Sequence, residues 1–380
     1  MKQLTIGVVA TSRKEDEHRL AIHPAHFDRI DPGLRARVFL EHGYGDRFGY
    51  PDADLAPLVG GSRTRAELFA ECDVLLLPKP VADDLRNLRP GQVVWGWPHC
   101  VQDAELTQLA VDRGLTLIAW EEMHHWTKEG NFSVHVFHKN NELAGYCSVL
   151  HALQLRGSTG DYGRRMRAAV ISFGATARGA VRALSALGIS DVTVFTQRSV
   201  SAVASPFASV RMQHFQRDPA DSGRVLALKA PEPGPLAQVL AQYDVVVNCM
   251  LQDTDEPLVF VRNDDLELFA RGTLFVDVSC DAGMGFEWAR PTSFADPMFT
   301  VGTDLHNYGV DHSPSFLWNS ATWENSEALL EYLPTVLAGP DAWDGSETIR
   351  RAIEIRAGRI QNPRILSFQG RAAAYPYAVA

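Results

Sequence analysis

The alternation of short apolar runs with segments of helical spacing constrains the fold more than any other feature of this chain. Strand-like runs occur at 5–10, 36–41, 73–78, 92–97 and 115–120, and again at 167–174, 191–196, 243–250, 273–279 and 298–302. Segments such as 63–70, 103–113 and 141–155 have helical spacing, and the segments 329–337 and 347–357 are predicted to be helices near the end of the chain. Because a crossover between parallel strands usually contains a helix, the alternation predicts an α/β protein with two sheet-containing units.

Composition places the chain among folded proteins and limits its partners. Of the 380 residues, 46% are hydrophobic and 22% are charged, which excludes the disordered, collagen-like and coiled-coil classes. The net charge of −10 argues against nucleic acid and anionic membrane surfaces as partners. The amino-terminal stretch lacks the apolar core of a signal peptide, and the five cysteines are scattered. We therefore expect a cytoplasmic protein with reduced thiols and no membrane segment.

A strand-like run is followed near residue 174 by a glycine turn and a helix of small residues. This arrangement binds a dinucleotide pyrophosphate, because the backbone approaches the phosphates closely and the positive end of the helix faces them. The fingerprint is degraded here, since Ser172 and Ala177 stand where glycines are usual, and an ordinary strand–helix turn is the alternative. The predicted contact residues are Ser172, Gly174, Ala175, Thr176 and Ala177.

The end of the next strand indicates which dinucleotide is bound. NAD sites place an acidic residue there to bind the ribose 2′-hydroxyl. This chain instead has Thr196, Gln197 and Arg198. An arginine suits a 2′-phosphate, so the sequence favours NADPH over NADH, with a solvated loop arginine as the alternative. Asn248 and Met250 end a later strand, where backbone groups often line a cofactor.

Several charged side chains follow strands in both units. Arg19, Lys79 and His99 each lie at or beyond the end of a strand in the first unit. Ligands of open parallel sheets collect at the carboxyl ends of strands, so these side chains are expected to converge on a substrate with a carboxylate and a proton to exchange. Taken alone, an arginine or lysine after a strand is more often solvated, and a histidine there is more often structural. In the second unit, Asp281 follows a strand and is expected beside a nicotinamide, whereas Asp277 within the strand is expected to be structural.

The order of these motifs resembles that of the alanine dehydrogenase and transhydrogenase α-subunit superfamily. The segments that carry the resemblance, over residues 5–315, are KEDEHRLAIHP, DVLLLPKP, WPHC, LIAWEEM, NNELAGY, the glycine turn and VDVSCDAG with FEWARPT. Within this superfamily the chain is most similar to the N5-(carboxyethyl)ornithine synthase branch, through the tracts 121–163 and 358–369.

The resemblance implies a fold and a set of residue roles. It implies two Rossmann-like domains, with a dinucleotide-binding domain at 141–304 inserted into a discontinuous substrate domain at 1–140 and 305–380, a cleft between them for the nicotinamide, and a homo-oligomer. It also implies that Arg19 and Lys79 bind the substrate carboxylate. By the same resemblance His99, with Lys79, exchanges protons, and Asp281 acts near the nicotinamide ribose.

The activity implied by the resemblance is an NADPH-dependent reductive condensation. The 2-keto acid pyruvate and the side-chain amine of an amino acid such as ornithine would form an imine, which hydride transfer reduces to a secondary amine. Glu142, Arg290 and His312 are candidates for binding the amino acid, although each is also compatible with a structural role. Where alanine dehydrogenases have Asn-Met-Pro, this chain has His312, Ser313 and Pro314, which counts against simple alanine deamination.

Other functions stay open at this point. An alanine dehydrogenase-like enzyme that uses ammonia, or a saccharopine-type dehydrogenase, would use the same residues, and a non-catalytic nucleotide-binding protein would keep the fold without turnover. A zinc site would draw on four nearby histidines, but the chain lacks a His-Glu-x-x-His motif, so no metal is predicted. The four are His124, His125, His135 and His138.

Overall fold

The computed structural model describes residues 3–198, 210–221, 223–228 and 233–379. The chain forms two compact units, one from residues 1–138 and 318–380 and the other from residues 139–317. The sequence predicts that the inserted domain ends at residue 304, whereas in the structure the second unit ends at residue 317. The difference arises because β19 (Leu305–Tyr308) pairs in parallel with β16 (Leu274–Asp277) of the second unit.

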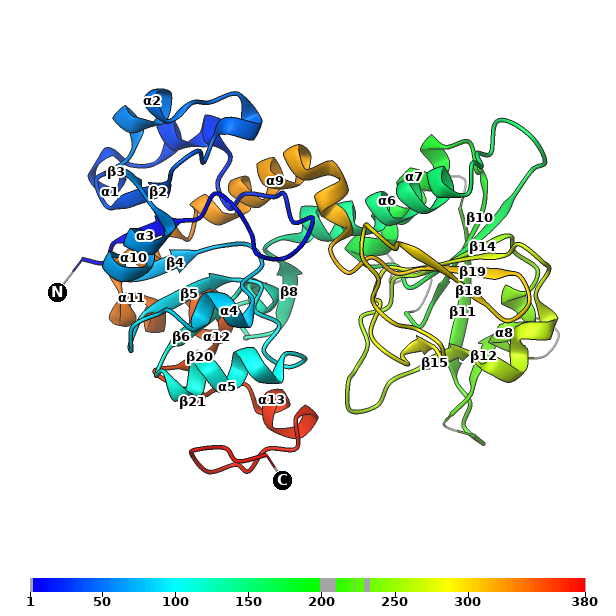
Figure 1. The fold of residues 1–380 in the computed structure, drawn as a ribbon. Coiled ribbons are helices and arrows are strands. Elements are labelled where there is room, and N and C mark those ends of the chain that lie inside the picture. Colours follow the sequence, from blue (N-terminus) through cyan, green and yellow to red (C-terminus); the bar gives the residue numbers. More distant parts are fainter. Residues whose placement is uncertain (1–2, 199–209, 222, 229–232, 380) are drawn as a thin grey trace. The chain divides into compact units, whose positions relative to one another are not determined.

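An eight-stranded sheet forms the centre of the first unit (Figure 1), in the order β21-β20-β6-β5-β4-β1-β2-β3. Strands β1 to β6 are parallel and follow the 3-2-1-4-5-6 order of a doubly wound fold, while β20 and β21 are antiparallel. The strands are β1 (Ile6–Val8), β2 (Val38–Glu41), β3 (Gly61–Arg63), β4 (Val74–Leu76), β5 (Val93–Gly96), β6 (Thr116–Ala119), β20 (Ile353–Arg356) and β21 (Arg359–Ile360), with a separate hairpin of β7 (His124–Trp126) and β8 (Phe132–His135).

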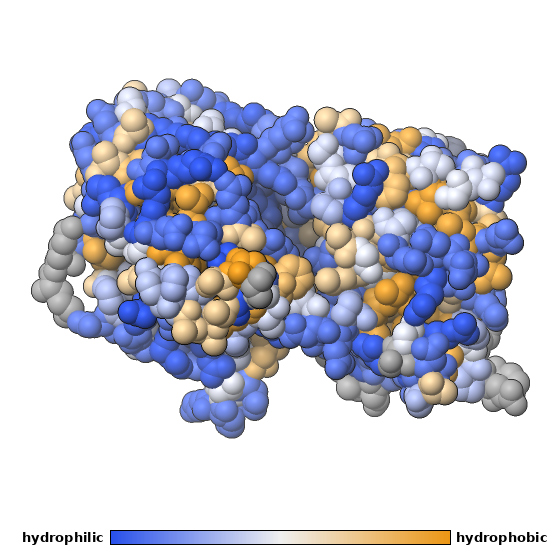
Figure 2. Space-filling view, turned by 60° about the horizontal axis from the view of Figure 1, so that its bottom comes forward, coloured by the Kyte–Doolittle hydropathy of each residue, from blue (hydrophilic) through white to orange (hydrophobic). Residues whose placement is uncertain are grey.

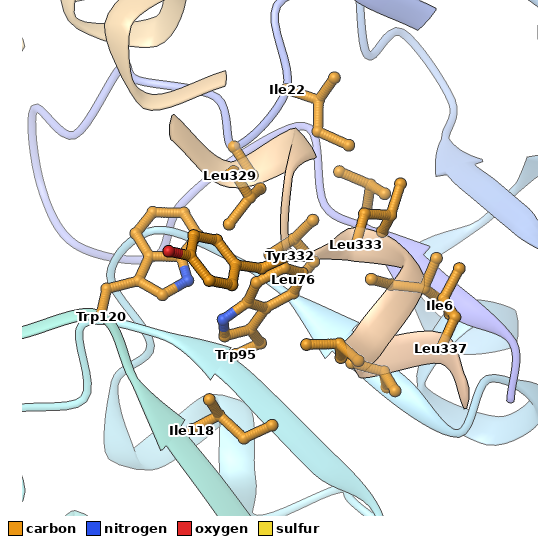
Figure 3. Close-up of a cluster of buried hydrophobic side chains, with 14 of the residues drawn as sticks. Ile6, Ile22, Leu76, Trp95, Ile118, Trp120, Leu329, Tyr332, Leu333 and Leu337 are labelled. Atoms are coloured by element: carbon orange, nitrogen blue, oxygen red, sulfur yellow. The ribbon is translucent and has the colours of Figure 1, made fainter. Parts of the chain in front are cut away.

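Helices cover both faces of this sheet, because successive strand residues point to opposite sides. In β4, Leu76 packs with the carboxy-terminal helices on one face and Leu75 packs with α3, α5 and α13 on the other. Figure 3 shows the first of these cores, with Leu333 and Leu337 from α10 close to Ile6. The helices are α1 (Pro32–Arg35), α2 (Asp52–Leu55), α3 (Arg65–Glu71), α4 (Ala82–Leu85), α5 (Ala104–Asp112), α9 (Trp318–Leu330), α10 (Leu333–Ala338), α11 (Pro340–Gly345), α12 (Glu347–Ala352) and α13 (Pro363–Phe368).

The second unit repeats this plan with a nine-stranded sheet in the order β13-β12-β11-β10-β9-β14-β16-β19-β18. Its parallel strands β11, β10, β9, β14, β16 and β19 again follow the 3-2-1-4-5-6 order, which confirms the predicted α/β class with two Rossmann-like units. The remaining elements are α6 (His138–Leu155), β9 (Arg167–Ile171), α7 (Ala175–Ala186), β10 (Asp191–Thr196), β11 (Val210–Arg217), β12 (Val225–Leu228), β13 (Gly234–Pro235), α8 (Leu236–Leu240), β14 (Val245–Asn248), β15 (Val259–Val261), β17 (Gly285–Phe286) and β18 (Met298–Val301).

Two glycines let α6 and α7 touch through their backbones. A Cβ at Gly145 would lie 1.9 Å from the carbonyl oxygen of Thr176, and a Cβ at Gly179 would lie 1.7 Å from that of Glu142. No larger residue fits at either position without separating the helices. This contact fixes the first turn of α7, which directly follows the glycine turn, against α6.

Candidate functional site

The first unit gathers its candidate side chains where its parallel strands end. β4 ends at Leu76 and β5 at Gly96, and Lys79 and His99 each follow three residues later. The two strands are parallel neighbours, and their chains approach closely beyond β4 because a Cβ at Gly96 would lie 2.0 Å from the carbonyl oxygen of Leu77. Strand pairing therefore brings Lys79 and His99 together, as the sequence predicts.

Lys79 and His99 form the central pair of this edge. The Lys79 Nζ atom lies 2.5 Å from Nε2 of His99. An ammonium group can only donate, so with Lys79 charged Nε2 is the acceptor and the ring proton is on Nδ1. That nitrogen lies 3.8 Å from Oε1 of Glu121, which also accepts the His99 backbone N–H at 2.7 Å. Lys79, His99 and Glu121 thus follow β4, β5 and β6, three adjacent parallel strands.

Glu121 is a member of this cluster that the sequence analysis does not select. It follows the strand-like run 115–120 closely, and this placement is the same signal that selects Lys79 and His99. His99 has a φ of +48°, a left-handed conformation that costs a non-glycine residue about 1–2 kcal/mol. The hydrogen bond from its N–H to the carboxyl offsets that cost. Burial raises the pKa of Glu121 well above its usual range, and Glu354 raises it further, whereas Lys79 opposes both effects.

Arg19 lies near the end of β5, where an acidic neighbour already binds it. Its Nε donates to Oε1 of Glu17 at 2.8 Å, and its Nη2 pairs with Oε2 of the same residue. The guanidinium carbon lies 4.9 Å from the centre of the Trp97 ring, two residues before His99. Arg19 and Glu17 are both buried. A buried two-point pair of this kind compensates much of the guanidinium charge.

In the second unit, the predicted glycine turn leads from β9 into α7. Ser172 has a φ of +82°, and Gly174 is the N-cap of the helix. A Cβ at Gly174 would meet no heavy atom within 4 Å, so the space around it is open. Ala175 and Thr176 form the first turn, and Ala177 is buried in the core. Because the first N–H groups of a helix lack partners within it, this open end fits a pyrophosphate.

A cavity of about 220 Å³ opens at the same edge of this sheet. Its lining includes Gln197, which follows β10, and Met250, which follows β14, together with Leu251. Arg198 is exposed beside Gln197, and its backbone N–H donates to the Thr196 hydroxyl at 3.1 Å. Doubly wound folds bind nucleotides at this edge, so the cavity and the open helix end together fit a dinucleotide.

A buried hydrogen-bond network joins the ends of β14 and β16. The Asn248 side chain donates to Oδ1 of Asp277 at 2.9 Å and accepts the Met250 backbone N–H at 3.1 Å. The Cys280 backbone N–H donates to the same Asp277 oxygen at 3.2 Å. Burial raises the pKa of Asp277 to about 7, and it also raises the pKa of Asp281, which follows Cys280. The network therefore anchors the loop that carries Asp281.

Two of the candidate amino-acid contacts take part in packing contacts of the second unit. Glu142 of α6 accepts from Nη1 of Arg182 in α7 at 2.6 Å, an ion pair that joins the two helices. The exposed Arg290 has its guanidinium carbon 4.4 Å from the centre of the Phe299 ring on the edge strand β18. These contacts give both residues a structural role.

His312 differs from those two, because it follows the parallel strand β19. It shares the carboxyl edge of the sheet with the Asp281 loop. Its Nδ1 lies 2.5 Å from a carboxylate oxygen of Asp311, and its ring meets Phe294 edge to face. The ring is buried. Of the three candidates, His312 is therefore the one placed at the edge where ligands of such sheets collect.

The four histidines considered for zinc lie on the β7–β8 hairpin and at the start of α6. The rings of His124 and His135 meet edge to face with their centres 4.8 Å apart. Burial lowers the pKa of His135 to about 3. Within the residues that the structure describes, no group of three or more His, Cys, Asp and Glu side chains could hold a metal ion.

The visible surface is largely hydrophilic, with separate apolar patches (Figure 2). Leu251, at the cavity of the second unit, is 92% exposed, which leaves an apolar side chain available to a flat ligand. In the part of the chain that the structure describes, no helix has the length and apolar character needed to cross a membrane.

The sequence and the fold of the chain both match those of known proteins. Residues 7–144 match the model of the alanine dehydrogenase/PNT amino-terminal domain, and residues 164–363 match that of the carboxy-terminal domain. An N(5)-(carboxyethyl)ornithine synthase of Clostridium botulinum is 21% identical, covering 84% of this chain and 90% of the relative. An alanine dehydrogenase of Mycobacterium tuberculosis is 25% identical, covering 86% and 85%. The structure of an L-alanine dehydrogenase superimposes with a TM-score of 0.75 at 18% identity, covering 96% and 99%, and so shares the fold.

Proposed function

Because the chain belongs to the alanine dehydrogenase/PNT family, we propose that it is an NADPH-dependent enzyme that condenses pyruvate or a similar 2-keto acid with the side-chain amine of an amino acid such as ornithine, and reduces the resulting imine. Family membership confirms the predicted resemblance and makes the chain an oxidoreductase of the alanine dehydrogenase/PNT family, which implies a pyridine nucleotide as its cofactor. The named relatives, a carboxyethylornithine synthase and an alanine dehydrogenase, support a reaction at an amino-acid CH–NH group. The proposal goes beyond family membership in naming the keto acid, the amine and the preference for NADPH. The observation that carries it is the Lys79–His99 pair at the carboxyl edge of the first sheet.

Positive charge at this edge binds the carboxylate of the keto acid. Lys79 and Arg19 supply that charge, and Lys79 contributes the larger share because Glu17 already compensates Arg19. A carboxylate held in this way orients the adjacent keto carbon for attack by the amine. The relative from Clostridium botulinum, named as a carboxyethylornithine synthase, supports an amino-acid side chain as the source of the amine.

The Lys79–His99 pair moves the protons of the condensation. Attack of the amine on the keto carbon forms a C–N bond and transfers one proton from nitrogen to oxygen. The resulting hydroxyl leaves as water after it receives a second proton, and the C=N bond forms. Because Nζ and Nε2 are 2.5 Å apart, one proton can pass between them without movement of either side chain.

The second unit provides the nucleotide site of the proposal. When NADPH is bound, its nicotinamide supplies the hydride that reduces the imine carbon. The N–H groups of the first turn of α7, after Gly174, bind the pyrophosphate, and the cavity at Gln197 and Met250 accepts the adenosine. Arg198 pairs with the 2′-phosphate, and Asp281 contacts the nicotinamide ribose.

A second candidate function is alanine dehydrogenation with ammonia as the amine. The relative from Mycobacterium tuberculosis, at 25% identity, favours it. The same Lys79 and His99 would act, so only the amine separates the two candidates. The test follows the loss of NADPH absorbance with pyruvate and either ornithine or ammonia at equal concentrations. Faster oxidation with ornithine supports the proposal, whereas oxidation with ammonia alone would establish the second candidate.

The cofactor preference has its own test at Arg198. Loss of a charge-assisted contact to the 2′-phosphate should raise the KM for NADPH about ten- to hundred-fold in Arg198→Ala and leave the KM for NADH unchanged. Arg211→Ala is the matched control, because this arginine pairs with Asp191 near the opposite end of the strands. A wild-type protein that uses NADH and NADPH equally would contradict the preference.

A further inference from the structure

The second unit has another cavity, of about 510 Å³, at the opposite end of its sheet from the glycine turn. Arg167 and Asp191 line it, and they are the first residues of β9 and β10. The glycine turn and Gln197 follow the last residues of the same two strands. The cavity is therefore separate from the nucleotide edge.

Thr193 of β10 lines this cavity and has a buried hydroxyl without a partner. Successive side chains of a strand point to opposite faces, so Val192 and Val194 pack with α7 while Thr193 faces the cavity with Asp191. Thr193 is 3% exposed, and its Oγ1 has no hydrogen-bond partner among the described residues. Buried hydroxyl groups are normally paired, so this one indicates a place for a polar atom of a ligand.

Gln213 provides a second unpaired group in the same cavity. It lies on β11, the parallel neighbour of β10. Its Nε2 atom is buried and has no partner in the part of the chain that the structure describes. An amide nitrogen can only donate a hydrogen bond. The cavity therefore offers a donor to an oxygen atom of a ligand.

The register of the sheet places these groups around Thr193. Thr193 pairs with Arg211 of β11 on one side and with Ala169 of β9 on the other. Gln213 and Arg167 are each two residues from those partners, so both share the face of Thr193 and lie on opposite sides of it. One small ligand at Thr193 is thus within the range of both longer side chains.

The charged residues of the lining leave an excess of positive charge. Arg211 forms a close ion pair with one oxygen of Asp191, and Nε of Arg167 lies 3.5 Å from the other oxygen. Asp244 accepts the Arg167 backbone N–H at 2.7 Å, but it lies outside the lining and pairs with Arg164. Two guanidinium groups therefore share one carboxylate in the cavity, which favours an anionic ligand.

The remaining wall suits an apolar body. Val239 of α8 and the ring of Tyr243 line the cavity, and the guanidinium carbon of Arg167 lies 4.9 Å from the centre of that ring. The volume is in the range of small-molecule sites and exceeds what a bare inorganic anion fills. A single excess positive charge matches a monocarboxylate better than a phosphate dianion.

We propose that this cavity is a second small-molecule site, which binds an organic carboxylate with an apolar body. The carboxylate accepts hydrogen bonds from the Thr193 hydroxyl and the Gln213 amide and is attracted by Arg167. The apolar body lies against Val239 and Tyr243. The site is independent of the proposed function, because it shares no residue with the catalytic edge or the nucleotide edge.

Methyl NMR of protein labelled at valine and leucine tests this site without any assay of activity. Val239 reports on the cavity and Leu251 on the nucleotide edge, and Val239→Ile and Leu251→Met identify their signals. Hexanoate, 3-phenylpropanoate and indole-3-propanoate are titrated singly. We expect at least one of them to shift the Val239 signal to saturation and to leave the Leu251 signal in place. No shift at Val239 with any of the three, or a shift at Leu251 alone, would overturn the site.

Two analogues test the charge of the ligand. The neutral 3-phenylpropanamide should not saturate the Val239 shift, and phenyl phosphate should bind more weakly than the carboxylates. An amide that binds as tightly as the acid would show that the positive charge is not used. Tighter binding of phenyl phosphate would identify a phosphate site, and either outcome contradicts a carboxylate ligand.

Thr193→Val tests the contact at the centre of the site. It removes the hydroxyl at nearly constant volume, and because that hydroxyl is unpaired the fold should be retained. The Kd of the carboxylate should rise about ten-fold, as expected for loss of one hydrogen bond to a charged group. Thr300→Val, at an exposed threonine of β18, is the matched control and should keep the Kd of the wild type. An unchanged Kd in Thr193→Val would overturn the assignment.

Discussion

Asp277 should make the stability of the protein depend on pH above neutrality. The carboxyl is fully buried in β16, its Oδ1 accepts two hydrogen bonds, and its Oδ2 has no partner among the described residues. Burial raises the pKa from 3.8 to about 7. The folded state therefore holds this proton more tightly than the unfolded state, and the stabilisation is complete below about pH 4 and is lost as the pH rises through about 7.

The magnitude follows from the size of the shift. Between about pH 5.5 and about pH 9, the wild type should lose about 2 kcal/mol through this one carboxyl, because each pKa unit corresponds to about 1.4 kcal/mol. In Asp277→Asn the amide oxygen keeps both hydrogen bonds and nothing titrates, so this loss is absent. For a unit of this size the difference corresponds to roughly 4–8 °C in Tm.

Scanning calorimetry of both proteins at the two pH values measures this effect. The difference in Tm between Asp277→Asn and the wild type should grow in favour of the variant as the pH rises, because all other groups titrate in both proteins. Asp296→Asn, at an exposed carboxyl of the same unit, is the matched control and should follow the wild type. A Tm difference for Asp277→Asn that is the same at both pH values would refute the reasoning.

Three further predictions concern single positions. His99→Gln should lower kcat about a hundred-fold or more with unchanged NADPH affinity, as measured by fluorescence titration, and near-normal turnover would contradict the proton relay. Gly179→Ala should destabilise the protein by about 3 kcal/mol in urea unfolding, because its Cβ would lie 1.7 Å from the Glu142 carbonyl oxygen. Gly174→Ala adds its Cβ in open space, so this variant should keep the stability of the wild type and bind NADPH more weakly. The five buried cysteines, with the pKa of Cys72 raised to about 11, should not react with a thiol reagent until the protein unfolds, and rapid reaction of the folded protein would contradict their burial.

The proximity of Lys79 and His99 could be predicted because it depends only on local information. Each residue follows an apolar run, and neighbouring parallel strands end at the same edge of a sheet. The same reasoning applies to the glycine turn and to Asp281, whose positions follow from the strand before them. Glu121 also follows an apolar run, 115–120, so the same rule identifies it as a candidate.

Glu354 could not be predicted, because its place depends on a contact between distant parts of the chain. The sequence predicts a helix over 347–357, but α12 ends at Ala352, and Ile353–Arg356 form β20. Ile353 and Ile355 pair with β6, more than two hundred residues earlier, and this pairing outweighs the local helical spacing. Sequence spacing likewise gave no sign that Glu17 binds Arg19 or that Arg182 binds Glu142.

The most direct test of the proposed activity is the identity of the product. The protein is incubated with NADPH, a set of 2-keto acids and a set of amino acids, and the mixture is analysed by mass spectrometry. The account predicts a secondary amine with the combined mass of one keto acid and one diamino acid, less one oxygen atom, formed only when Lys79 and His99 are intact. Formation of alanine from pyruvate and ammonia, with no secondary amine from any pair, would contradict it.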